Sequence, residues 1–526
     1  MKSWMTWRPK NSRLSNMDKF YVTTAIDYVN AAPHLGHALE KIQADVISRR
    51  QRLLDKDVFF LTGTDEHGAK VLRAAQAQSK DAKIFVDEIS GVFKNFAKEL
   101  NISYDDFIRT SDRIRHWPGA EKIWEKLKAK GDIYKANYNG LYCVGCEAFI
   151  TKKDLINGKC ATHNQEPEEI SEENYFFKLS RYQKRIEKAI RSEKFKIVPE
   201  SKKNEALGLI KEGLGDISFS RPAKDIGWGI PVPGDDSQTM YVWADALSNY
   251  ISALGYGTTD LKKFKRYWPA DVQVIGKDIL RFHALIWPAI LMSAGLKLPK
   301  TLLVHGHVTV AGKKMSKSLG NAIDPFDLID RYGSDALRYY LSREISTTED
   351  GDITEEKFKE SYNANLANGL GNYASRVLKM AEQYFGGALD KPEEDLLAKI
   401  PFKKNNREFF SVPYVFEKFV WPEYEKAMNN FELDKAMDIA WGAISRLDGY
   451  IQDYQPFKLI NDDKEKTRAI LWNLVFGLAN IAWMISPFLP ETTKKIFQAL
   501  GIDEKKKDGW NEFRVKSIHP LFARKD

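Results

Sequence analysis

Two hydrophobic spacings follow one another near the start of the chain. Residues 20–26 are rich in β-branched and aromatic side chains, the composition of a buried strand. After a break that ends at Pro33, apolar residues recur every three or four positions from Leu35 onward. The pattern predicts a strand that feeds a helix with one apolar face.

The predicted start of this helix carries two histidines three residues apart, His34 and His37, with Gly36 between them. Backbone N–H groups without helical partners and the helix dipole favour anions at such an end. We interpret this arrangement as a place where phosphate binds. An ordinary helix start with two surface histidines is the alternative.

Three further segments repeat the pattern of an apolar strand followed by a polar turn: residues 58–68, 272–283 and 301–308. Together they predict an α/β fold with a parallel, Rossmann-type sheet. Because ligands of such sheets bind beyond the carboxyl ends of the strands, Asp65 should lie close to His34. Asp65 is therefore a candidate for holding a substrate ammonium group, with a helix N-cap as its alternative role.

A basic loop follows the last predicted strand. Residues 312–321 contain three lysines and two serines, with a glycine near each end. Such a loop can wrap a triphosphate and stabilise the charge that develops on a leaving group. A solvated charged loop is the alternative.

Helical spacing dominates after about residue 350, in residues 358–384, 414–450 and 467–500, where we expect no strands. These segments predict an all-α helical bundle. Within the last one, residues 470–485 are apolar enough to suggest a membrane span. Two asparagines interrupt this run and Pro487 ends it, so we expect a buried bundle helix.

Length and composition limit the class of protein. A chain of 526 residues suggests about three domains, and its 12% aromatic and 43% hydrophobic content excludes a disordered chain. The net charge of +8 suits a polyanionic partner. Residues 1–16 are basic but lack the apolar core of a signal peptide, so we expect a short extension and a cytoplasmic protein.

All three cysteines fall in one short segment, as Cys143-x2-Cys146 and then Cys160-x2-His163. This spacing suits tetrahedral Zn²⁺ with three thiolates and one imidazole. Because protein side chains would fill every coordination position, the metal would be structural. A disulfide with one cysteine left over is the alternative.

An aromatic, nearly uncharged segment spans residues 238–250. Trp243, Ala246, Leu247 and Tyr250 are candidates for one wall of an apolar pocket that takes an unbranched side chain. Plain core packing explains these residues equally well.

In the helical part, Asn372 and Arg376 lie four residues apart on one predicted helix, and Phe457 follows Pro456. An Asn and an Arg on one exposed face can read base edges while an aromatic ring stacks a splayed base. A solvated polar face is the alternative.

The ordered set of motifs resembles the methionyl-tRNA synthetases, a family of class I aminoacyl-tRNA synthetases, over nearly the whole chain. The matching motifs are His34-Leu-Gly-His37, Thr62-Gly-Thr-Asp-Glu-His-Gly68, Tyr241-Val-Trp243, Ile275-Gly-Lys-Asp278 and Lys314-Met-Ser-Lys-Ser318, together with the single Cys3His knuckle. The resemblance implies that the protein joins methionine and ATP to form methionyl-adenylate and pyrophosphate. The methionyl group would then pass to the 2′-hydroxyl of the terminal adenosine of initiator and elongator tRNA(Met).

The resemblance also implies roles for single residues. Methionine would contact Ala25, Ile26, Tyr28, Asp65, Trp243, Ala246, Leu247, Tyr250, Ile279 and His283. ATP, with Mg²⁺, would contact His34, Gly36, His37, Gly276, Asp278, Lys314, Ser316, Lys317 and Ser318, of which His34, His37, Lys314 and Lys317 would be catalytic. The anticodon would contact Asn372, Arg376 and Phe457, and structural Zn²⁺ would be held by Cys143, Cys146, Cys160 and His163.

Two positions depart from the family pattern. Phe457 stands where the family usually has Trp, and it offers less stacking area and no indole N–H. Asp27 stands where many members have an apolar residue or Pro. No further tRNA-binding module follows Leu500, so we expect a monomer.

Two other interpretations remain open. One is a different class I synthetase, against which the aromatic pocket around Trp243 argues. The other is a non-enzymatic RNA-binding relative, against which the intact histidines and lysines of the two signatures argue.

The expected domain order follows from these assignments. Residues 1–17 would be an N-terminal extension, and residues 18–116 with 229–349 would form the Rossmann-type catalytic domain. Residues 117–228 would be a connective insertion with a zinc knuckle at 143–163. Residues 350–526 would be the α-helical anticodon-binding domain.

Overall fold

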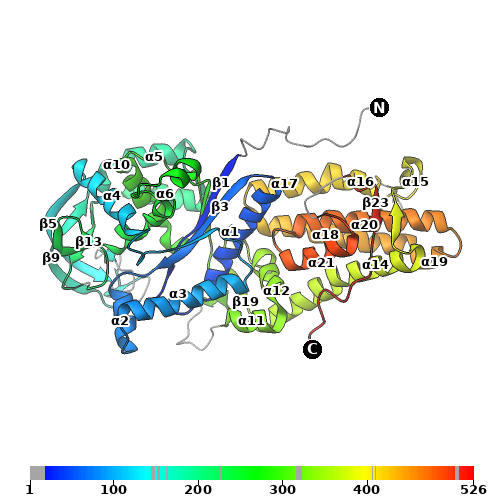
Figure 1. The fold of residues 1–526 in the computed structure, drawn as a ribbon, viewed down its shortest axis with the longest axis horizontal. Coiled ribbons are helices and arrows are strands. Elements are labelled where there is room, and N and C mark those ends of the chain that lie inside the picture. Colours follow the sequence, from blue (N-terminus) through cyan, green and yellow to red (C-terminus); the bar gives the residue numbers. More distant parts are fainter. Residues whose placement is uncertain are drawn as a thin grey trace.

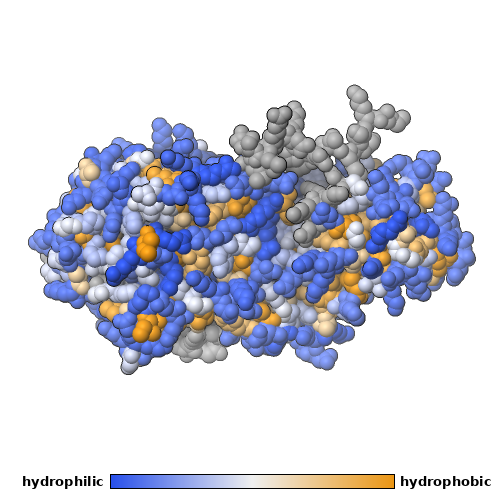
Figure 2. Space-filling view, viewed as in Figure 1, coloured by the Kyte–Doolittle hydropathy of each residue, from blue (hydrophilic) through white to orange (hydrophobic). Residues whose placement is uncertain are grey.

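The protein is elongated, with an α/β half and a helical half along its long axis (Figure 1). The computed structural model describes residues 18–143, 148–150, 155–161, 164–225, 227–314, 323–404, 407–408, 410–503 and 509–526. Hydrophilic residues cover most of the face shown in Figure 2, with smaller hydrophobic patches between them.

A seven-stranded sheet lies at the centre of the α/β half, as the sequence predicts. Its order is β10-β16-β15-β1-β3-β2, and β4 also pairs with β3. The strands are β1 (Lys19–Thr24), β2 (Asp27–Tyr28), β3 (Asp57–Asp65), β4 (Asp106–Arg109), β10 (Lys196–Val198), β15 (Val272–Gly276) and β16 (Thr301–His305). Every pairing is parallel, so the carboxyl ends of the strands share one edge of the sheet.

Alternate side chains of the central strands face opposite sides of this sheet, as the pleat requires. Tyr21 and Leu61 pack on the side of α10 (Trp287–Ala294), whereas Val22 and Phe60 pack on the side of α1 (Leu35–Leu53). The apolar cluster on the α1 side continues without interruption into the helical half. The two halves therefore share one hydrophobic core.

Residues 117–228 contain the helices α4 (Trp117–Ala129), α5 (Gln183–Arg191) and α6 (Glu200–Glu212) together with antiparallel strands. The long strands β5 (Ile133–Cys143) and β9 (Glu168–Phe177) form a sheet with two short strands, β6 (Ala148–Ile150) and β11 (Ile217–Ser218), in the order β11-β9-β5-β6. The same stretch of chain also supplies β10, which pairs with β16 in the main sheet. This part is consequently attached to the parallel sheet by backbone hydrogen bonds. The boundaries of the insertion at residues 117 and 228 stay a prediction.

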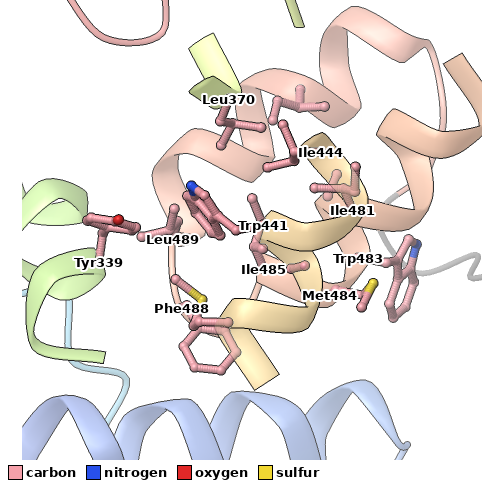
Figure 3. Packing of buried hydrophobic residues seen from close by; sticks show 14 of the residues in the cluster. Tyr339, Leu370, Trp441, Ile444, Ile481, Trp483, Met484, Ile485, Phe488 and Leu489 are labelled. Atoms are coloured by element: carbon pink, nitrogen blue, oxygen red, sulfur yellow. The ribbon is translucent and has the colours of Figure 1, made fainter. Parts of the chain in front are cut away.

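The helical half contains α14 (Asn372–Phe385), α17 (Trp421–Asn429), α18 (Leu433–Tyr454), α20 (Lys464–Ile485) and α21 (Pro490–Leu500). Residues 414–450, in which helical spacing predominates, contain a π-helical segment (Phe416–Val420), α17 and α18, and the chain changes direction between the last two at Phe431, where φ is 61°. Figure 3 shows Trp441 and Ile444 of α18 lying among Ile481 and Ile485 of α20. Interlocking side chains of this kind hold the helices together.

Helix α20 is long and apolar enough to cross a membrane by length and composition, and 89% of its apolar window is buried inside the protein. This matches the expectation of a buried bundle helix. Asn473 donates from Nδ2 to the Tyr450 hydroxyl oxygen at 2.9 Å, and Asn480 accepts from Trp421 Nε1 at 2.8 Å. The two asparagines thus bond to neighbouring side chains within the bundle.

The expectation of no strands after residue 350 is wrong. Strand β19 (Gly351–Ile353) pairs with β17 (Val308–Val310), and β20 (Ala388–Asp390) pairs with β23 (Glu512–Arg514). Strands of three residues are too short to produce a detectable alternation of apolar and polar positions.

Candidate active site

The start of α1 has a fixed hydrogen-bond arrangement around its two histidines. His34 is the N-cap, and its Nδ1 accepts from the Gly36 N–H at 3.1 Å. His37 Nδ1 accepts in turn from the His34 N–H at 3.1 Å. Because each Nδ1 is an acceptor, each neutral ring carries its hydrogen on Nε2. The two side chains therefore offer two N–H donors at a helix end that already favours anions.

Gly36 is the residue that allows this arrangement. A Cβ at that position would lie 2.9 Å from His34 Cε1 and 3.1 Å from His34 Nδ1. The two imidazoles also stack, with ring centroids 3.8 Å apart. A larger residue would displace the His34 ring from its cap.

Protonation of His37 is unfavourable in this setting. Burial lowers the pKa of His37 well below its usual value, and repulsion from His34, Lys41 and His305 lowers it further. A second proton on the ring would also require Nδ1 to give up the His34 N–H bond. His37 is thus a neutral hydrogen-bond donor at physiological pH.

The carboxyl ends of β15 and β16 lie beside α1. Gly276 and His305 are register partners, and His305 Nε2 lies 3.1 Å from Glu40 Oε2 of α1. Although burial lowers the pKa of His305, the bond to Glu40 outweighs it, so the pKa is raised. Asp278 lies in the turn after Gly276, with its Oδ1 3.5 Å from His307 Nε2. The predicted nucleotide residues at the start of α1 and in the turn after β15 are therefore close to one sheet edge.

The ten predicted methionine residues come from four places along the chain. Ala25, Ile26 and Tyr28 follow β1, and Asp65 ends β3, where its register partner is Tyr28. Trp243, Ala246, Leu247 and Tyr250 lie on α7 (Val242–Ala246), α8 (Asn249–Ser252) and their connection, while Ile279 and His283 follow β15. Eight of these ten side chains, all but Asp65 and Ala246, pack in or against one apolar cluster or contact a member of it: Ala25, Ile26, Tyr28, Trp243, Leu247, Tyr250, Ile279 and His283.

The aromatic wall has a defined geometry. Trp243 stacks on Phe282 with ring centroids 3.8 Å apart and an interplanar angle of 9°, and its ring meets His283 edge-on. Trp243 is half-buried, whereas Tyr250 and His283 are each 1% exposed. The segment is therefore part of the core, while Trp243 stays partly exposed, so the pocket wall remains a prediction that is compatible with core packing.

His283 is held neutral inside this wall. Its Nδ1 donates to the Ile279 carbonyl oxygen at 3.0 Å, so its Nε2 accepts from the Tyr250 hydroxyl at 2.7 Å. Burial lowers the pKa of His283 to about 4. An uncharged imidazole suits a pocket for an apolar side chain.

The polar cluster after β3 is braced by contacts that sequence patterns did not indicate. Asp65 lies 3.4 Å from the Thr110 hydroxyl, and Glu66 accepts two bonds from the Arg109 guanidinium, at 2.6 and 2.9 Å. Asp65 is 6% exposed and Glu66 is fully buried. The two bonds from the Arg109 guanidinium thus hold Glu66, and with it the backbone of the adjacent Asp65, which is the candidate for binding the ammonium group.

A second brace joins this cluster to the aromatic wall. Buried Asp245 bonds to His67 Nδ1 and His116 Nε2, each at 2.6 Å. Burial raises the pKa of Asp245, but the two histidines together have a larger effect in the opposite direction, so the pKa lies below its usual value. Asp245 lies two residues after Trp243, so the contact sets the distance between Asp65 and the wall. These partners lie 178 and 129 residues away in the chain, which is why local patterns could not reveal them.

The basic loop begins from a β-hairpin. Strand β18 (Lys313–Lys314) pairs with β17 through a turn in which Ala311 and Gly312 have φ values of 51° and 71°. The Gly312 N–H donates to Asp352 Oδ1 at 2.7 Å. Ser316, Lys317 and Ser318 lie outside the described residues, as does the Lys314 side chain.

Two of the four predicted zinc ligands lie in the described part of the chain. Cys143 ends β5 and Cys160 ends a two-residue strand, and both are buried in one small cluster with Leu141 and Leu155. The Asn164 N–H donates to the Cys160 carbonyl oxygen at 2.8 Å, so the chain reverses after Cys160. Cys146 and His163 lie outside the described residues.

The three predicted anticodon residues lie in the helical half. Asn372 is exposed at the start of α14, and Arg376 Nη1, one turn further, bonds to Asp448 Oδ1 of α18 at 3.3 Å. Phe457 is 40% exposed in the short helix α19 (Pro456–Leu459), which follows the end of α18. The Phe457 ring and the Asn372 side chain are therefore open to solvent, whereas the Arg376 guanidinium is paired with the Asp448 carboxylate.

Comparison with known proteins gives a consistent result. A model for the class I tRNA synthetases (M) matches residues 20–160 and 146–378. The chain is 44% identical to a methionine–tRNA ligase of Caldanaerobacter subterraneus, over 92% of this chain and 74% of that protein, and 41% identical to one of Thermotoga maritima, over 97% and 80%.

Solved structures agree with the sequence relatives. The fold is similar to that of Mycobacterium tuberculosis methionyl-tRNA synthetase in complex with methionyl-adenylate, with a TM-score of 0.89 and 36% sequence identity. The match covers 97% of this chain and all of that one.

Proposed function

The chain belongs to the methionine–tRNA ligases of the class I aminoacyl-tRNA synthetases, and from that premise we propose the role of each part of its site. The single observation that carries the assignment of roles is the meeting of three features at one sheet edge. These are the paired N–H donors of α1, the carboxyl ends of β15 and β16, and the aromatic wall around Trp243.

Methionine binds in the apolar pocket after β1 and β3. Its side chain lies against the wall of Trp243 and Tyr250, and its ammonium group pairs with Asp65. The neutral state of His283 supports this assignment, because a cation there would oppose both an apolar side chain and the nearby ammonium group. The remaining contacts are Ala25, Ile26, Tyr28, Ala246, Leu247 and Ile279.

ATP lies between the start of α1 and the turn after β15. Gly276 and Asp278 contact the nucleoside, and Gly36 with the Nε2–H groups of His34 and His37 contacts the phosphates. The basic loop with Lys314, Ser316, Lys317 and Ser318 covers the phosphates from the other side. Mg²⁺ accompanies ATP as part of the substrate.

Adenylate formation needs no protein nucleophile. A carboxylate oxygen of methionine attacks the α-phosphorus of ATP, the bond from that phosphorus to the bridging oxygen breaks, and pyrophosphate leaves with both electrons. Positioning and charge stabilisation supply most of the catalysis in such a transfer. Neutral donors from His34 and His37 and cationic donors from Lys314 and Lys317 stabilise the oxygens on which negative charge develops.

In the second step, the 2′-hydroxyl of the terminal adenosine of tRNA(Met) attacks the methionyl carbonyl and AMP leaves. We assign anticodon contacts to Asn372, Arg376 and Phe457. The exposure of Phe457 supports this, because an aromatic ring left open to solvent is available for stacking a base. The Arg376 guanidinium would exchange Asp448 for a base edge.

Zn²⁺ would hold the knuckle between β5 and β9. Burial of Cys143 and Cys160 in one cluster supports this assignment, and the donor set is completed by Cys146 and His163. The ion would supply structural cross-linking of a segment with little core of its own. We further propose a monomeric, cytoplasmic protein and the domain boundaries given above.

Charging of tRNA tests the whole proposal. The protein should attach methionine to a tRNA(Met) transcript with a CAU anticodon and lose most of this activity when the anticodon is changed, while adenylate formation stays the same. Equal charging of both transcripts would contradict the anticodon assignment.

A further inference from the structure

Asp27, which departs from the family pattern, has a buried partner. Lys41 Nζ forms an ion pair with Asp27 Oδ2 and lies 3.3 Å from the Thr62 hydroxyl oxygen. Lys41 is fully buried and Asp27 is 6% exposed. A fully buried ammonium group is rare in proteins unless a carboxylate pairs with it.

This ion pair lies directly behind the phosphate-binding end of α1. Lys41 is one helical turn after His37, and Asp27 is in β2, between the predicted methionine residues Ile26 and Tyr28. Asp27 Oδ1 is 4.0 Å from His37 Nε2, the atom that carries the His37 hydrogen. The carboxylate therefore joins the methionine side of the site to the ATP side.

The surroundings of His37 explain why both charges are needed. The groups facing its ring are His34 and Lys41 on α1, Asp27 on β2, and His305 on β16, which is paired with Glu40. At 4.0 Å the Asp27 carboxylate does not accept the Nε2–H, which stays available to a phosphate, but its negative charge favours the tautomer with the hydrogen on Nε2. An unneutralised carboxylate at this place would repel a triphosphate bound to the same N–H. An adjacent ammonium group removes that conflict.

We propose that Asp27 and Lys41 act together as positioning residues for adenylate formation: the Asp27 carboxylate favours the Nε2–H tautomer of His37, and Lys41 neutralises Asp27 so that the triphosphate can bind beside it. The proposal rests on the proposed function of His37 as a phosphate ligand. It accounts for the occurrence of Asp27 in this chain, since the acid is useful only with Lys41 one turn along α1.

The behaviour of the carboxyl group without Lys41 gives a specific signature. Burial already raises the pKa of Asp27 to about 6 with Lys41 beside it, and loss of the cation raises it further. In a Lys41→Met variant the group is protonated at neutral pH and becomes an isolated negative charge as the pH rises. Unit charges about 7 Å apart at an effective dielectric constant of about 20 repel strongly enough to weaken binding about tenfold or more.

The test measures KM for ATP and for methionine in pyrophosphate exchange between pH 7 and pH 9. In Lys41→Met, KM for ATP relative to the unaltered protein should rise about tenfold across this range, with KM for methionine unchanged. In Asp27→Asn/Lys41→Met the rise should disappear, because no carboxylate remains. Lys122→Met, an exposed lysine on α4 (Trp117–Ala129), is the matched control and should follow the unaltered protein throughout.

The single variant Asp27→Asn provides a second, independent test of the proposal. It removes the carboxylate that favours the Nε2–H tautomer of His37, so kcat should fall about tenfold without any rise in KM for ATP. Because Asp27→Asn leaves the buried Lys41 ammonium without its carboxylate, far-ultraviolet circular dichroism must first show that the variant is folded. The double variant Asp27→Asn/Lys41→Met keeps no buried charge, so it keeps the proposal testable when either single variant does not fold.

Three results would overturn the proposal. They are parallel pH profiles for Lys41→Met and the unaltered protein, retention of the rise in the double variant, or an equal change in KM for both substrates in Asp27→Asn. Failure of the proposed function would look different, because the unaltered protein would then show no methionine-dependent exchange at any pH.

Discussion

Replacement of Arg338 should weaken the coupling between the unfolding of the two halves of the molecule. Arg338 lies on α12 (Ser334–Tyr339) and is fully buried. Its Nε donates to the Phe488 carbonyl oxygen at 2.7 Å and its Nη2 to the Pro487 carbonyl oxygen at 2.9 Å, both after α20. Nη1 donates to the Leu100 carbonyl oxygen at 3.1 Å, and Nη2 lies 2.7 Å from Asp45 Oδ2 on α1. One guanidinium thus links the helical bundle to α1, the helix that carries His37.

The cost of Arg338→Met follows from these contacts. Methionine fills part of the volume but leaves three buried carbonyl oxygens without this donor and removes one partner of a buried ion pair. Removing one partner of such a pair typically costs ~3–5 kcal/mol. Asp45 keeps its bonds to Arg49 and Ser103, so we expect about 3 kcal/mol, the lower end of that range.

Equilibrium urea unfolding, followed by far-ultraviolet circular dichroism and tryptophan fluorescence, measures this cost. Arg331→Met is the control, because Arg331 is 40% exposed and its pairs with Asp327 and Glu355 are surface salt bridges worth less than about 1 kcal/mol. We expect Arg338→Met to shift the midpoint far more than the control and to make the two probes unfold at different urea concentrations. Equal, small shifts for both variants would refute the argument that Arg338 couples the halves.

Four further predictions address the site and the distant binding regions. Lys317→Ala should slow single-turnover adenylate formation by an amount equivalent to ~3–4 kcal/mol of barrier, as for other lost transition-state donors, with normal KM for methionine; a change mainly in that KM would exclude the assigned role. His283 is buried as a neutral ring with a pKa of about 4, against about 6.5 when unfolded, so its contribution to stability is complete above about pH 6.5 and is lost as the pH falls towards 4. His283→Gln should therefore flatten the acid side of the stability profile by roughly 3 kcal/mol, and an unchanged slope would count against burial of the neutral ring. Cys160→Ala should lower the zinc content measured by atomic absorption from one ion per chain to about none and destabilise the knuckle to proteolysis, whereas retained zinc would exclude Cys160 as a ligand. Phe457→Ala should raise KM for tRNA about tenfold or more while leaving pyrophosphate exchange intact, and Phe457→Trp should keep or improve it.

The parts of the fold that were predictable from sequence are those set by local patterns. The order of strand, polar turn and helix at the start of the chain predicts α1 and its two histidines, and the structure confirms the helix from Leu35 with His34 as its cap. The parallel sheet follows because each apolar strand is separated from the next by enough chain for a crossover. The buried character of α20 follows from its interrupting asparagines.

The missed features depend on contacts between distant residues. Asp245 and its two histidines come from three separate segments, and the break at Phe431 carries no Gly or Pro to mark it. The pairing of Asp27 with Lys41 could be found only from the three-dimensional structure. No sequence spacing relates a residue in a strand to its contact in a separate helix. Sequence alone identified Asp27 as unusual but gave no account of it.

Methionine-dependent exchange between ATP and pyrophosphate, run beside the other amino acids and without tRNA, tests the central claim most directly. It requires the two histidines, the basic loop and the aromatic pocket to act in one site. We predict exchange with methionine and none of comparable rate with the other standard amino acids. Exchange with a different amino acid, or none from folded and zinc-loaded protein, would contradict the account.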